Sequence, residues 1–114
     1  MSRHDDRTRM HQMLDYAQKA QAMIAGRQRT DLDSDFVLQL ALTRAVEVIG
    51  EAASRVSEFS RSTHPDVLWR DIVGMRNRLI HGYDMVDLDL LWDTVMTDLP
   101  PLIAALERVL READ

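Results

Sequence analysis

The chain has 114 residues, of which 46% are hydrophobic and 29% are charged, and its net charge is −5 at pH 7. A chain of this size and composition can bury one hydrophobic core, which excludes a disordered or fibrous protein and predicts a single domain over residues 1–114. The absence of cysteine excludes a disulfide framework and a thiolate metal site, and the acidic charge argues against a broad basic surface for nucleic acid.

A first helix is predicted over residues 5–25, followed by a polar loop over residues 26–34. Gly26 is expected to end the helix, and Asp33 or Ser34 is expected to cap the next one. The apolar side chains of the first helix recur at helical spacing and form one stripe: Met10, Met13, Leu14, Ala17, Ala20 and Ile24.

A second long helix is predicted over residues 35–59. Its main apolar stripe runs from Leu38 to Phe59, and it carries further apolar residues off that stripe at Val37, Leu40 and Val46. A helix that is apolar over so wide an arc is expected to bury two sides, one of them against a partner subunit.

A short connector over residues 60–64 leads to Pro65, which is expected near the first position of a third helix. Trp69 is predicted to anchor this helix in the core, with or without an interruption nearby. Asp87 is expected to cap the last helix, which should kink or break near Asp98 because Pro100-Pro101 lack amide donors.

The predicted fold is therefore all-α, an up-and-down bundle of four to five helices whose last helix is kinked or broken at Pro100-Pro101. No stretch approaches the length of a membrane span, and the first residues carry no apolar leader. We therefore expect a cytoplasmic protein with no membrane contact.

The groups best suited to acid/base and phosphate chemistry lie together in Arg76-Asn77-Arg78-Leu79-Ile80-His81-Gly82-Tyr83. An imidazole titrates near neutral pH, so His81 could move a proton, and an arginine fork such as Arg76 grips phosphate oxygens. Together they suggest metal-free cleavage of RNA, in which the 2′-hydroxyl attacks the neighbouring phosphorus. Arg78 could help Arg76 to hold the phosphoryl oxygens.

The helix that carries this stretch is expected to end at or near His81, before Gly82. Arg76 and His81 would then lie about 140° apart around the helix, so their convergence needs the long arginine side chain, a break at Gly82 or a second subunit. The spacing alone also fits an Arg and a His that merely interact with the negative end of the helix dipole.

Glu47 and Glu51 lie four residues apart on the second helix, between Arg44 and Arg55. A ladder of surface ion pairs accounts for this pattern. Positive charge gathers near the motif, because residues 54–83 contain five arginines against three acidic residues. Local and salt-sensitive contact with RNA is expected there.

Arg76-x4-His81-Gly82-Tyr83 resembles the Arg-x4-His-x-Tyr signature of the HepT-like proteins, which are toxins of the HEPN superfamily. The similarity extends over about residues 10–110, and several flanking stretches match in order and spacing: Ile49-Gly50-Glu51-Ala52-Ala53, His64-Pro65-Asp66-Val67-Leu68-Trp69, Val86-Asp87, Trp92 and Asp98-Leu99-Pro100.

The resemblance implies a single HEPN domain that forms a two-fold homodimer, with Arg76 and His81 of both subunits lining one cleft. It further implies the toxin of a toxin-antitoxin pair, a metal-independent endoribonuclease that cleaves tRNA or mRNA and leaves a 2′,3′-cyclic phosphate. No metal or cofactor is expected. Asn77, Arg78 and Glu51 would support the site, with Glu51 orienting Arg76 or His81.

By the same resemblance, a cognate minimal nucleotidyltransferase antitoxin would transfer AMP to Tyr83. The added bulk and negative charge would block the site. Two other hypotheses stay open. One is a non-catalytic HEPN subunit that binds a nucleotide or its nucleotidyltransferase partner, and the other is a purely structural dimerisation bundle.

Overall fold

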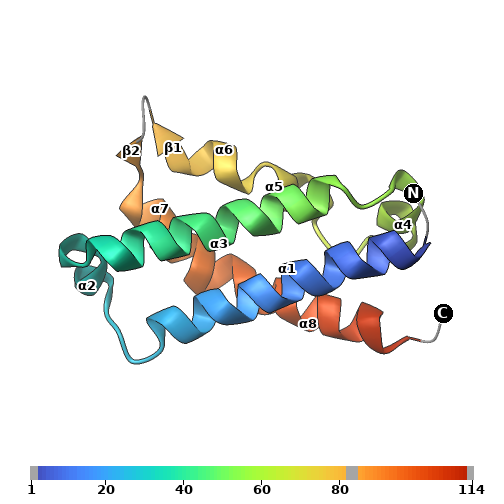
Figure 1. Ribbon diagram of the computed structural model, residues 1–114, viewed down its shortest axis with the longest axis horizontal. Coiled ribbons are helices and arrows are strands. Elements are labelled where there is room, and N and C mark those ends of the chain that lie inside the picture. Colours follow the sequence, from blue (N-terminus) through green and yellow to red (C-terminus); the bar gives the residue numbers. More distant parts are fainter. Residues whose placement is uncertain (1–2, 82–84, 113–114) are drawn as a thin grey trace.

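The computed structural model describes residues 3–81 and 85–112. Three long helical segments run side by side along the molecule; the first runs opposite to the second and the third, which run in the same direction (Figure 1). These segments are α1 (Arg3–Ile24), α3 (Phe36–Ser54) and the continuous run of α7 (Leu88–Asp93), the π-helical segment η1 (Thr94–Asp98) and α8 (Leu99–Arg111).

Four short helices and one short strand pair complete the described part of the chain. The helices are α2 (Arg29–Ser34), α4 (Glu58–Thr63), α5 (Trp69–Val73) and α6 (Met75–Leu79). The strands β1 (Ile80–His81) and β2 (Met85–Val86) pair in antiparallel register. The prediction of an all-α bundle is confirmed, and the two strands, of two residues each, are a small addition to it.

The core lies where α1, α3 and the last helical segment meet. The stripe predicted for α1 is buried except at Leu14, which is partly buried. The largest fully buried side chains come from all three segments and from the short helices between them: Met13, Leu32, Leu42, Ile49, Met75, Leu79, Leu91, Leu99 and Leu106. Burial of apolar surface on this scale is the main force that holds the bundle together.

The turn after α1 contains the predicted glycine, but the next long helix has a different N-cap from the one predicted. Gly26 has φ of 75°, a left-handed conformation that glycine adopts without strain. Residues predicted as loop form α2 instead. The apolar side chain of Leu32 is fully buried in the core, and this burial holds the short helix in place. The prediction of Asp33 or Ser34 as the cap of the next helix was wrong. Asp35 caps α3, since its carboxylate accepts a hydrogen bond from the Leu38 amide.

The second predicted helix is divided, and α3 ends at Ser54 instead of Phe59. Ser57 begins α4 by accepting a hydrogen bond from the Ser60 amide. The buried carboxylate of Asp6 on α1 accepts hydrogen bonds from the Ser57 amide and from both serine hydroxyls. Because this network stabilises a second helix start, α4 turns away and Phe59 is 75% exposed.

The region predicted as a third helix consists of two short helices, α5 and α6, which meet at Gly74. The expected connector over residues 60–64 lies largely within α4. Trp69 is buried as predicted, and its indole nitrogen donates a hydrogen bond to the His64 carbonyl. The helix expected to end at or near His81 ends at Leu79, two residues earlier, and the backbone then enters β1.

The last helical segment is interrupted close to the predicted position. Asp87 caps α7 by accepting a hydrogen bond from the Leu90 amide. The segment then passes through η1, where the Leu99 amide donates to the Thr94 carbonyl, five residues back. Pro100 and Pro101 occupy the first turn of α8, where missing amide donors cost least. The π turn therefore absorbs the change in hydrogen bonding that the two prolines impose.

Candidate active site

The predicted site residues lie on and after α6, a five-residue helix packed against α3 (Figure 1). Met75 and Leu79 are each 1% exposed and fix this short helix in the core. Arg76, Asn77 and Arg78 lie between them and are exposed. The buried pair at spacing four therefore decides which face of α6 presents the polar groups.

Gly50 on α3 allows α5, and with it α6, to approach closely. A Cβ atom at this position would lie 3.3 Å from the Ile72 carbonyl oxygen and 3.6 Å from that of Val73. The shorter of these distances is tighter than ordinary van der Waals contact, so a side chain at this position would require α5 to shift away from α3 by a few tenths of an ångström. The glycine within the family-like stretch thus has a structural reason, which is close helix packing.

Arg76 is held by a carboxylate from α3. Its Nε donates a hydrogen bond to Oε2 of Glu47 over 2.9 Å. The Arg76 side chain is 50% exposed, whereas that of Glu47 is 22% exposed. The pair uses one donor of a guanidinium that carries five, so the rest of the fork is available for a phosphate.

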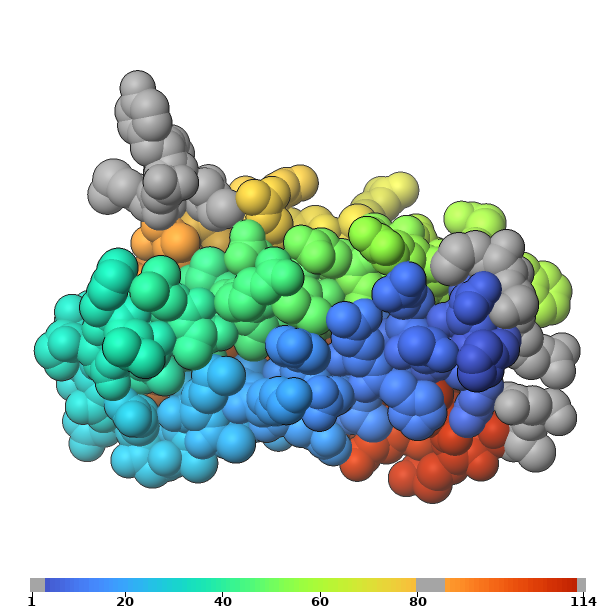
Figure 2. All heavy atoms as spheres, in the orientation of Figure 1, coloured from blue at the N-terminus to red at the C-terminus, as the bar shows by residue number. Residues whose placement is uncertain are grey.

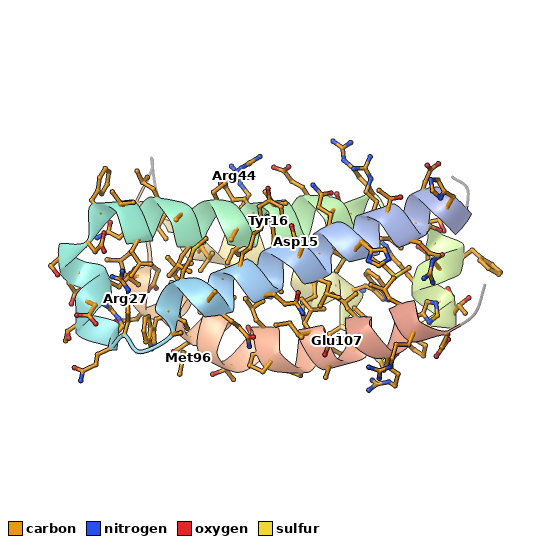
Figure 3. All side chains as sticks on the ribbon, turned by 60° about the horizontal axis from the view of Figure 1, so that its bottom comes forward. Asp15, Tyr16, Arg27, Arg44, Met96 and Glu107 are labelled. Carbon is orange, nitrogen blue, oxygen red and sulfur yellow. The ribbon has the colours of Figure 1, made fainter. Side chains whose placement is uncertain are left out.

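The prediction named Glu51 as the orienting carboxylate, but the described contact to Arg76 comes from Glu47. Glu51 instead lies 3.7 Å from Arg44, in an ion pair between two exposed side chains on α3. Arg44 projects from α3 away from the bundle (Figure 3). The ladder pattern indicated both carboxylates, and only the placement of α6 beside α3 distinguishes between them.

Arg78 does not share the surroundings of Arg76. Two residues along a helix correspond to a rotation of about 200°, so the two arginines leave α6 on nearly opposite sides. Arg76 contacts α3, whereas Arg78 lines a cavity between α5, α6 and the start of α8. Asn77, between them, is exposed.

His81 lies beyond the end of α6. Its backbone lies in β1 opposite Met85, so the helical angle of about 140° expected between Arg76 and His81 does not apply. The side chain of His81 lies outside the described part of the structure, as do Gly82 and Tyr83. Their predicted roles therefore stay predictions.

Some of the arginines that raise the local charge have structural roles. Arg61 donates hydrogen bonds to the carbonyl oxygens of Ala53, Ser54 and Val56 at the end of α3. A cation in this position satisfies terminal carbonyls and interacts with the negative end of the helix dipole. Positive charge near α6 is therefore supplied by fewer residues than the sequence suggested.

Within residues 3–81 and 85–112, no group of three or more His, Cys, Asp or Glu side chains is placed to hold a metal ion. In the same part of the chain, no helix is long and apolar enough to cross a membrane.

Residues 13–109 match the family model described as "Ribonuclease HepT-like". A Thermococcus cleftensis protein named "Probable ribonuclease HepT" is 39% identical over 79 residues, which are 69% of this chain and 72% of that protein. A Methanocaldococcus jannaschii protein named "Putative RNase MJ1380" is 31% identical over 109 residues, which are 96% of this chain and 100% of that protein. No solved structure matches the chain.

Proposed function

The chain belongs to the family of HepT-like ribonucleases, and we propose that it cleaves RNA without a metal ion at a site built around Arg76 and His81. The observation that carries the proposal is the ion pair of Arg76 with Glu47, which fixes an exposed guanidinium five residues before the histidine. A preorganised cation of this kind is what a phosphoryl transfer site requires.

In the proposed reaction, the 2′-oxygen of one nucleotide attacks the adjacent phosphorus. The bond between the 2′-oxygen and phosphorus forms while the bond between phosphorus and the 5′-oxygen breaks. His81 takes the proton from the 2′-hydroxyl or returns one to the leaving 5′-oxygen. Arg76 binds the phosphoryl oxygens as their negative charge grows, and the products are a 2′,3′-cyclic phosphate and a 5′-hydroxyl.

We propose that the active form is a two-fold homodimer. Three large apolar side chains near the beginning of α3 face solvent in the single chain, with Phe36 67%, Val37 75% and Leu40 56% exposed. The outer surface of α3 is open along much of its length in Figure 2. Leu40, Arg44 and Glu47 share this face, so a second subunit packed here would lie next to the partner of Arg76.

One residue expected at a partner interface belongs to the core instead. Val46 is fully buried within its own chain. A contact with a second subunit would therefore be narrower than predicted and would use the side of α3 that carries Val37 and Leu40.

We further propose that the protein is the toxin of a toxin-antitoxin pair in the cytoplasm, and that a cognate minimal nucleotidyltransferase antitoxin inactivates it by transferring AMP to Tyr83. Tyr83 follows His81 by two residues, so an attached phosphate would add negative charge beside the proposed phosphate site. The alternative is a non-catalytic subunit that binds a nucleotide or that nucleotidyltransferase. This alternative is favoured only if Arg76 binds phosphate without RNA cleavage.

The proposal is tested with end-labelled bulk tRNA in the presence of a chelator. Purified protein whose intact mass excludes AMP on Tyr83 is compared with its His81→Ala variant. Cleavage by the unmodified wild type, lost in His81→Ala, supports the proposal. Binding of tRNA without cleavage by a folded, dimeric wild type supports the alternative.

A further inference from the structure

A cavity of about 380 Å³ opens between α5, α6 and the beginning of α8. Its floor is apolar, since the buried side chains of Ile72, Met75 and Leu102 line it. Arg78, Asp71 and Asp98 provide polar groups around this floor. Its volume is within the range of pockets that take small ligands or single building blocks of a polymer.

These three polar groups have no partner among the described residues. A fourth charged lining residue, Asp66, is paired with Arg108, and this hydrogen bond holds the pKa of Asp66 below its ordinary value. The side chains of Arg78, Asp71 and Asp98 make no hydrogen bond or ion pair with any residue in the described ranges 3–81 and 85–112. One unengaged cation and two unengaged carboxylates therefore surround a single apolar floor.

A nucleotide of the RNA substrate fits this combination of groups. The flat face of a base can lie against the apolar floor, and an arginine fork can bind the attached phosphate. The carboxylates can accept hydrogen bonds from the N–H groups of the base edge. Arg78 leaves α6 on nearly the opposite side from Arg76, so a nucleotide bound in the cavity would lie across α6 from the phosphate at Arg76 and would belong to a separate part of the same strand.

We propose that this cavity binds one base of the RNA, across α6 from the cleaved bond, and prefers guanine. The inference rests on the proposed ribonuclease function. Guanine alone among the four bases presents two adjacent N–H donors on its pairing edge, which one carboxylate can accept together. Uracil presents a single N–H between two carbonyl oxygens, which the carboxylates repel. Arg78 therefore binds the nucleotide in the cavity and does not share the phosphate held by Arg76.

Binding to the cavity can be measured without any cleavage. The full chain is labelled with ¹³C at the methionine methyl groups, and the signal of Met75 is assigned with Met75→Leu. Guanosine 5′-monophosphate and uridine 5′-monophosphate are then titrated separately. We expect the guanine nucleotide to shift the Met75 signal and to bind at least about fivefold more tightly than the uracil nucleotide.

Variants identify the groups that bind the base and the phosphate. Asp71→Asn or Asp98→Asn should remove the preference for the guanine nucleotide. Arg78→Gln should weaken the binding of both nucleotides. Asp93→Asn, an exposed carboxylate outside the cavity lining, is the matched control and should change neither. Equal binding of the two nucleotides, or no shift at Met75 with either, would overturn the inference.

The same samples separate this inference from the proposed function. Guanine-selective binding at Met75 with no cleavage of any RNA would leave the base pocket in place and refute the ribonuclease proposal. Cleavage dependent on His81 together with equal binding of the two nucleotides would support the ribonuclease and refute the base pocket.

Discussion

Replacing Glu47 by glutamine tests whether this carboxylate positions Arg76. The substitution keeps the size of the side chain and removes its charge, so the guanidinium loses its ionic anchor on α3. Two unit charges about 4 Å apart attract by about 4 kcal/mol at a dielectric constant of 20 and by about 1 kcal/mol in water. Because the Arg76 side chain is 50% exposed, the lower value applies, and the free energy of unfolding should fall by about 1 kcal/mol or less.

The effect on cleavage should be much larger than the effect on stability. A catalytic group displaced by about 1 Å can cost a factor of about 100 in rate, so we expect kcat to fall about ten- to hundredfold. The assay compares kcat, KM and Tm of the wild type, Glu47→Gln and the matched control Glu51→Gln, whose carboxylate pairs with Arg44 instead. Equal kcat in Glu47→Gln and Glu51→Gln would refute the positioning role.

Three further predictions concern the scaffold. Gly50→Ala should lower cleavage several-fold by displacing α5, while the better helix propensity of alanine keeps the change in unfolding free energy within about 1 kcal/mol; unchanged kinetics would contradict this. Asp6→Asn should destabilise by about 1–3 kcal/mol at pH 7 through its bonds with Ser57, measured by urea unfolding. Burial raises the pKa of Asp6, but the hydrogen bonds outweigh it and hold that pKa below 3.8, so this contribution is present above pH 3.8 and is lost as the pH falls through the lowered value; a difference in unfolding free energy that does not shrink as the pH is lowered through this range would contradict it. Val37→Asp with Leu40→Asp should shift the sedimentation of a dimer to that of a monomer, whereas an unchanged dimer would exclude this face of α3.

The long helices could be predicted from the sequence because apolar spacing alone sets their buried faces. The first helix was expected over residues 5–25 and runs from Arg3 to Ile24, with Gly26 in the expected left-handed turn. The end of α3 could not be predicted in this way. Its apolar pattern continues to Phe59, and the break depends on Asp6, a residue more than fifty positions earlier that stabilises the start of α4.

The candidate site could be predicted only in part, because its contacts also depend on residues that are far apart in the chain. The sequence identified Arg76 as a candidate, and the structure gives it a partner and an exposed position. The sequence could not distinguish Glu47 from Glu51 as the partner of Arg76, because both lie on the same face of one helix. Only the packing of α6 against α3 decides which carboxylate is near Arg76. The division between Arg76 and Arg78 also requires α8, which forms one wall of the cavity that Arg78 lines.

The chemistry of the RNA ends tests the central claim most directly. Mass spectrometry of the fragments that the wild type produces in the presence of a chelator should show 2′,3′-cyclic phosphate and 5′-hydroxyl ends, and none should form with Arg76→Ala or His81→Ala. An RNA with a 2′-deoxynucleotide at the cleaved position should resist the enzyme, because the attacking hydroxyl is missing. Fragments with 5′-phosphate ends, or equal cleavage of the 2′-deoxy substrate, would show that water attacks the phosphorus and would contradict the mechanism.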